Sequence, residues 1–122
     1  MAYLLCTYFG EHGVREAAKL LERNAQEGTR ILGSFNAPID HWLDFFCFTH
    51  FIDRDGKYQL KMLSTSSFQP LAASMGPMLK EESFHLGTGA NGLRRIVKQG
   101  VIPCALLQKY INKWVSTGLD LF

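Results

Sequence analysis

Three residues of this 122-residue chain, Asp53, Glu82 and His85, have side chains of the kinds that could form a carboxylate-rich metal site. Glu82 and His85 form a Glu-x-x-His pair, and on a helix they would share one face because residues three apart are neighbours there. Asp53 lies in an earlier, strongly apolar segment. In helical bundles, such a pair and an acid from a neighbouring helix form one half of a carboxylate-bridged di-iron site. Oxygen and nitrogen ligands suit iron or manganese, and zinc is also possible.

Two helices must position these side chains. The first is expected over about residues 41–63, with Asp40 as its N-cap, and the second begins near Pro70. The segment TSSF at 65–68 breaks the pattern between them. In an antiparallel pair that turns there, Asp53 and Glu82 each lie roughly 12 residues, or about 18 Å, from the turn. The sequence therefore predicts that these two acids lie at the same level.

Two nearby residues are weaker candidates. His50 lies one turn before Asp53 and could compete as a ligand, although a hydrogen-bonded core histidine is the commoner role. Glu81 points about 100° away from Glu82, so it is either exposed or acts indirectly by orienting a metal-binding histidine. A surface ion pair between Glu82 and His85 is the simple alternative to a metal site.

The remaining pattern is also helical, so the fold class is predicted to be all-α. Gly76 and Pro77 predict a kink in the helix that begins near Pro70. Glycines at 87, 89 and 92 predict that this helix loosens before a separate short helix. The other expected elements are a helix over 14–27, a loop over 28–38, a short helix near 92–99 and a last helix near 103–117.

Both ends of the chain are apolar, whereas domain ends are usually polar. The segment AYLLCTYF follows Met1 without a capping residue, and we expect residues 1–10 to be the end of a truncated helix. The chain stops at GLDLF. These features predict that residues 1–122 form a single partial domain of a longer protein.

Composition excludes several functional classes. The net charge of +2, without a long basic run, does not suggest nucleic-acid binding. No apolar run is long enough for a membrane span. The three cysteines are far apart in sequence, and two lie among Leu and Phe residues, so we expect buried, reduced thiols in a cytoplasmic protein.

Four segments together resemble a known family. The chain is similar to the oxygenase component of benzoyl-CoA 2,3-epoxidase through FFCFTHFIDRDGKYQLKML, SFQPLAASMGPMLKEESFH, GLRRI and QKYINKW. The resemblance runs through almost the whole chain and is densest from Phe45 to His85. It implies an incomplete ferritin-like helical bundle. It also implies that Asp53, Glu82 and His85 are the second half of a di-iron ligand set whose first half lies upstream.

The resemblance further implies an NADPH-dependent di-iron monooxygenase. Such an enzyme uses O2 to epoxidise the ring of benzoyl-CoA, with electrons from a separate flavin and iron–sulfur reductase. Arg94 and Arg95 are candidates for contacts with the CoA phosphates. Lys57 stands where many bacterial di-iron hydroxylases have a threonine, so the role of that threonine does not carry over.

The ligand count limits what this chain can do alone. Nothing in the sequence replaces the missing half of the ligand set, so we expect the isolated chain to be inactive. Two alternatives remain open: a helical module without redox chemistry, and a half-site that binds metal only as a symmetric dimer.

Overall fold

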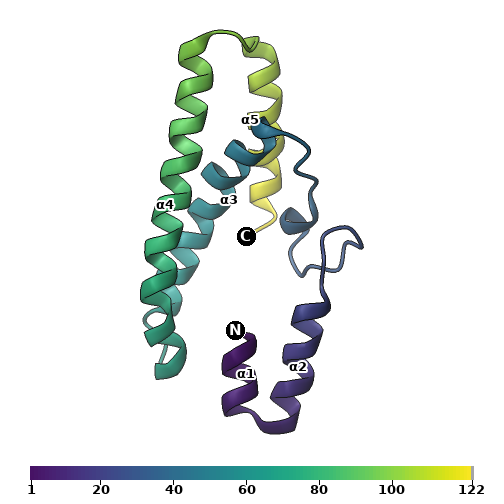
Figure 1. Ribbon diagram of the computed structural model, residues 1–122, viewed down its shortest axis with the longest axis vertical. Helices are drawn as coiled ribbons and strands as arrows, with labels where there is room; N and C mark the ends of the chain where they lie inside the picture. The colour runs from purple at the N-terminus through teal and green to yellow at the C-terminus, as the bar shows by residue number, and fades with distance from the viewer. Residues whose placement is uncertain (122) are drawn as a thin grey trace.

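The computed structural model describes residues 1–121, which form helices and contain no strand (Figure 1). The all-α prediction is therefore confirmed. The elements are α1 (Ala2–Tyr8), α2 (Gly10–Glu22), the short 3₁₀ helix η1 (Gly33–Asn36), α3 (Trp42–Leu63), α4 (Gln69–Gln99) and α5 (Cys104–Leu119).

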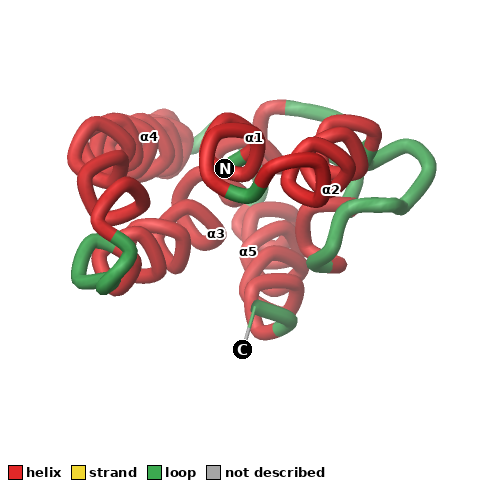
Figure 2. The backbone as a smooth tube through the Cα atoms, turned by 90° about the horizontal axis from the view of Figure 1, so that it is seen from below, coloured by secondary structure: helices red, strands yellow, loops and turns green. Residues whose placement is uncertain are grey.

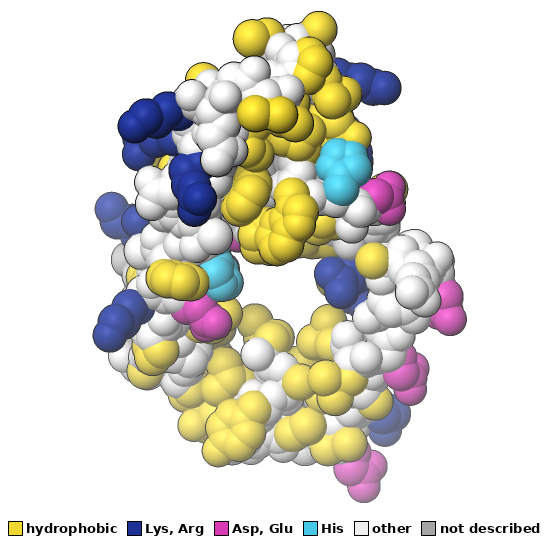
Figure 3. All heavy atoms as spheres, turned by 45° about the horizontal axis from the view of Figure 1, so that its top comes forward, with side chains coloured by type: hydrophobic (Ala, Val, Ile, Leu, Met, Phe, Trp, Pro, Cys, Tyr) yellow, Lys and Arg dark blue, Asp and Glu magenta, His cyan; other side chains and the backbone are white. Residues whose placement is uncertain are grey.

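Helix α3 lies between α4 and α5 and packs against both, as Figures 1 and 2 show. Helices α1 and α2 form a hairpin that packs mainly on itself at one end of the molecule. The rings of Tyr8 and Phe9 contact Phe68 in the α3–α4 turn, with centroids 5.4 and 5.9 Å apart. Figure 3 shows an opening through the molecule with hydrophobic side chains above and below it.

The core joins α3 to α5 around Cys47, Ile52 and Trp114. Asp44 is 1% exposed, and it accepts hydrogen bonds from Lys113 Nζ at 2.6 Å and Trp114 Nε1 at 2.8 Å. Burial by itself would raise the pKa of Asp44, but these two donors outweigh it and lower the pKa. A satisfied buried carboxylate thus fixes α5 against the first turns of α3.

Helix α4 is continuous over 31 residues, so the predicted interruption and the separate helix near 92–99 are wrong. Gly89 and Gly92 are buried because they face α3. A Cβ at Gly89 would lie 2.6 Å from Thr49 Oγ1 and 2.7 Å from the backbone nitrogen of His50, and one at Gly92 would overlap the ring of Phe46. These glycines allow two helices to approach closely, and they do not end α4.

Pro77 is also accommodated within α4, without a break in the helix. The expected helix over 14–27 is shifted, since α2 begins at Gly10 and ends at Glu22. Gly10 takes a positive φ at the turn between α1 and α2. Asn24 then ends the pattern, because its side chain accepts a hydrogen bond from the backbone of Glu27 and stabilises a turn.

Two smaller expectations are also corrected. Asp40 is not the N-cap of α3: the N-cap is His41, and the backbone N–H of Asp40 donates to Asp44 Oδ2. Of the three cysteines, which are all free thiols, only Cys47 is buried. Its burial raises the thiol pKa to about 11.

No helix within residues 1–121 combines the length and apolarity that a bilayer crossing requires.

Candidate metal centre

Asp53 from α3 meets Glu82 and His85 from α4, as the sequence predicts. One potential ligand atom of each lies within 4.8 Å of the others. His85 Nδ1 is 3.8 Å from Asp53 Oδ2 and 3.7 Å from Glu82 Oε1. In the described part of the chain, no other group of three His, Cys, Asp or Glu residues gathers in this way. We call these three residues the acid–histidine cluster.

The glycine contacts explain why the cluster forms. Three contacts between α3 and α4 share one register, because the midpoint of the two residue numbers is 69 in each of them, and α4 begins at residue 69. These contacts are Phe46–Gly92, Thr49–Gly89 and Asp53–His85. The close approach therefore sets the register of α4 along α3, and the cluster lies one helical turn from the Thr49–Gly89 contact. His85, and not Glu82, is level with Asp53; Glu82 reaches the cluster from the neighbouring turn.

The cluster carries more negative charge than the protein neutralises. The side chains of Asp53 and Glu82 are only 15% and 22% exposed, whereas that of His85 is 40% exposed. Burial, and to a lesser extent the nearby Glu82, raise the pKa of Asp53 to about 6, although His85 opposes them. Glu82 Oε2 is buried without a hydrogen-bond partner. An orphaned carboxylate oxygen is costly unless a cation binds it.

A divalent metal ion fits this donor set. Two carboxylates and one imidazole are typical ligands of iron and manganese, and zinc can also use them. The two carboxylates also offer more lone pairs than His85 alone can satisfy. Three protein ligands leave coordination positions open, as a catalytic metal requires.

His50 is not part of the cluster. Its Nδ1 is buried without a partner, and its Nε2 lies 3.5 Å from Arg54. Burial is the main cause that lowers its pKa, and the charges of Arg54 and Arg94 lower it further. The positive charges of Arg54 and Arg94 would repel a metal cation from His50, which makes it a poor competitor for the metal that the cluster would bind.

The other candidates lie outside the cluster. Glu81 is exposed on α4. Arg94 and Arg95 are exposed about 14 Å further along α4 than His85. Arg95 lines a hollow of about 390 Å³ with Phe46, whereas Arg94 does not line it. The two arginines are thus not directed at one shared hollow.

The metal-free cluster should cost folding stability at neutral pH. The pKa of Asp53 is about 6 in the folded chain against an ordinary 3.8, so folding disfavours its charged form. The cost is small below pH 3.8, grows as the pH rises from 3.8 to about 6, and is almost fully present above that. We therefore expect Asp53→Asn to stabilise the metal-free chain by up to about 3 kcal/mol at pH 7.5 and to have little effect at pH 4.

Urea unfolding with a chelator present measures this difference at both pH values. Asp55→Asn makes the same chemical change two residues along α3, outside the cluster, and serves as the matched control. If Asp53 acted only as an ion-pair partner of His85, Asp53→Asn would destabilise the chain at pH 7.5. That result would contradict the strained-cluster interpretation.

Comparisons with known proteins show the family of this chain. Residues 1–122 match a family described as phenylacetic acid catabolic protein. Benzoyl-CoA oxygenase component B of Aromatoleum evansii is 39% identical over 143 aligned positions, which cover all of this chain and 30% of that relative. The helical architecture is consistent with the expected ferritin-like bundle. This chain therefore belongs to the phenylacetic acid catabolic protein family, and it is similar to component B of benzoyl-CoA oxygenase.

Proposed function

We propose that this chain supplies half of the metal site of an oxygenase that acts on the ring of an aromatic acyl-CoA. The observation that carries the proposal is the acid–histidine cluster, in which a buried carboxylate oxygen of Glu82 has no protein partner. The similarity to benzoyl-CoA oxygenase component B indicates the substrate class.

Asp53, Glu82 and His85 would hold iron, and the bound iron would supply the activation of O2. The residues of this chain have three tasks. The two carboxylates keep their charge and bind the cation, His85 adds a nitrogen ligand, and the Gly89 contact with α3 holds both helices at this register. Residues 1–122 would be one partial domain, and helices outside them would provide the other half of a di-iron ligand set.

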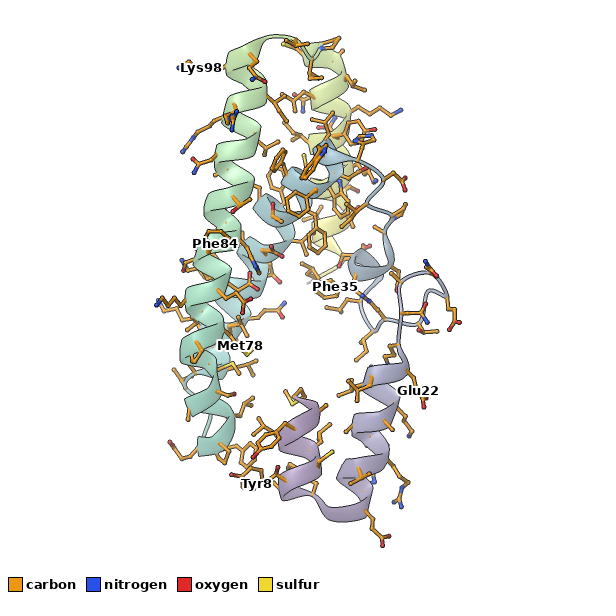
Figure 4. All side chains as sticks on the ribbon, in the orientation of Figure 1. Tyr8, Glu22, Phe35, Met78, Phe84 and Lys98 are labelled. Carbon is orange, nitrogen blue, oxygen red and sulfur yellow. The ribbon has the colours of Figure 1, made fainter. Side chains whose placement is uncertain are left out.

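Apolar surface beside the cluster suits an aromatic ring. Phe84, which precedes His85, is 73% exposed, and Met78, one turn before Glu82, is 44% exposed (Figure 4). A benzoyl ring that covered Phe84, whose ring centroid lies 6.4 Å from that of His85, would bury apolar area on both partners, which is favourable in water. The proposal is that such a surface orients the ring toward the metal.

The finer features of the reaction belong to the same proposal. The product would be the 2,3-epoxide of benzoyl-CoA, and NADPH would supply electrons through a flavin and iron–sulfur reductase. The cytoplasm is the proposed compartment, because all three cysteines are unpaired. Glu81 would orient a histidine of the other half-site. Arg94 and Arg95, which are exposed near the end of α4, are one candidate site for the CoA phosphates.

Isotope labelling tests the proposed function. The complete oxygenase component that carries this chain is supplied with benzoyl-CoA, NADPH, the reductase and ¹⁸O₂. We expect oxygen consumption that depends on benzoyl-CoA and one ¹⁸O atom in the acyl-CoA product. Electron flow through the reductase without a labelled product would contradict the proposal, as would a product whose added oxygen came from water.

A further inference from the structure

A basic groove lies between α3 and α4, next to the acid–histidine cluster but outside it. Its volume is about 570 Å³. Arg54, Lys57 and Lys61 contribute three positive charges from one face of α3, since residues three and four apart lie along one side of a helix. The rest of the lining consists of Tyr58 and Ser64 from α3 and of Leu79, Ser83 and Leu86 from α4.

These three cations have no acidic partner in the described part of the chain. No ion pair within 4.0 Å involves Arg54, Lys57 or Lys61, and no Asp or Glu lines the groove. The guanidinium group of Arg54 instead faces the ring of His50. Cations gathered along a hollow without a counter-charge attract anions, and phosphate groups accept hydrogen bonds from both Lys and Arg.

The groove is aligned with the candidate metal centre. Arg54 follows Asp53 in sequence, Ser83 follows Glu82, and Leu86 follows His85, so one end of the groove lies on the turns that hold the cluster. Lys61 is eight residues beyond Asp53, or about 12 Å along the helix axis. A ligand with its phosphates at Lys57 and Lys61 could therefore extend its other end to the cluster.

We propose that this basic groove binds the phosphates of the CoA part of the substrate. The identity of the acyl group rests on the proposed function, whereas the binding of CoA itself does not. The groove is a better candidate than Arg94 and Arg95, because it places three cations in one hollow. The hollow that Arg95 lines does not include Arg94, and Arg95 is its only charged residue.

Calorimetric titration of this chain with CoA tests the proposal. We expect Lys57→Glu and Lys61→Glu each to weaken CoA binding by about tenfold or more, since each loses a charge-assisted contact with phosphate. Lys98→Glu is the matched control, because Lys98 lies at the far end of α4 and points away from the other helices (Figure 4). Inorganic pyrophosphate should bind more weakly than CoA if the groove accommodates more than a free phosphate group.

Kinetics in the complete oxygenase component give an independent result. Both groove variants should raise the KM for benzoyl-CoA by about tenfold and change kcat by less than about twofold. This pattern is expected when a lost contact binds the substrate and the transition state equally well. With benzoyl-N-acetylcysteamine, a thioester that lacks the phosphates, they should react like the wild-type protein.

Several results would overturn the groove proposal. These are a wild-type chain that binds no CoA, groove variants that lose no more affinity than Lys98→Glu, and a selective loss of CoA binding in Arg94→Glu or Arg95→Glu. Glu82→Gln should leave CoA binding unchanged. Normal CoA binding by a protein that fails the ¹⁸O₂ test would therefore refute the oxygenase proposal alone.

Discussion

Replacing any member of the acid–histidine cluster should lower turnover of the complete oxygenase component at least about a thousandfold, a barrier increase of about 4 kcal/mol. Asp53→Asn, Glu82→Gln and His85→Ala each remove or weaken one metal ligand, and even residues that only orient ligands often matter 10- to 100-fold. Product formation from benzoyl-CoA and iron per protein measure the effect. We expect activity and iron to be lost together.

Matched controls separate this loss from general damage. Glu22→Gln and His12→Ala make similar changes on α2, where both side chains are exposed; Figure 4 labels Glu22 there. These variants should keep nearly full activity and iron content. A cluster variant with wild-type turnover would remove that residue from the metal site, and a variant that kept its iron but lost activity would assign it a different role.

The second large effect concerns the register of α4. Gly89→Ala should destabilise the protein by about 2 to 3 kcal/mol, because its Cβ would collide with the backbone of α3 and force the helices apart. Gly87→Ala should do the opposite and stabilise by up to about 1 kcal/mol, because nothing lies within 4 Å of a Cβ there and alanine is the better helix former. Urea unfolding followed by circular dichroism measures both.

The same substitution should disturb the metal site one turn away. Displaced helices would separate Asp53 from His85, and we expect Gly89→Ala to weaken iron binding at least about tenfold, since a 1 Å misplacement can cost a hundredfold in a catalytic site. Gly92→Ala should have a smaller effect, because the atoms nearest to its Cβ belong to the side chain of Phe46, which can move more easily than backbone. Equal iron affinity in Gly87→Ala and Gly89→Ala would show that the close approach does not position the ligands.

The three ligand candidates could be predicted because their spacing is a local property. Glu82 and His85 share a face of their helix however that helix packs. The break at 65–68 joins this helix to the preceding one, and an antiparallel arrangement of the two brings Asp53 near the pair. The predicted alignment of Asp53 with Glu82 was wrong by about one helical turn, since His85 is the residue level with Asp53. The loop between two helices does not determine how far they are displaced along each other. That distance depends on the packing of Gly89 against Thr49, which is a long-range contact.

The glycines themselves show where local patterns mislead. Glycine lowers helix propensity, so Gly89 and Gly92 predicted a break, but burial against α3 outweighs an intrinsic cost of about 1 kcal/mol each. The basic groove was not predicted, because no local pattern shows that α4 packs beside Arg54, Lys57 and Lys61 and makes a hollow there. Exposure of Cys6 likewise depends on the position of the α1–α2 hairpin.

The most direct test of the proposed half-site is an anaerobic ferrous titration of this chain, with His85→Ala and His12→Ala measured alongside. We expect the wild-type chain to bind no more than one iron, and weakly, because three ligands leave the metal only partly coordinated. His85→Ala should abolish this binding and His12→Ala should not. Two tightly bound irons per chain, or equal binding by the wild-type chain and His85→Ala, would contradict the assignment of Asp53, Glu82 and His85 as half of a metal site.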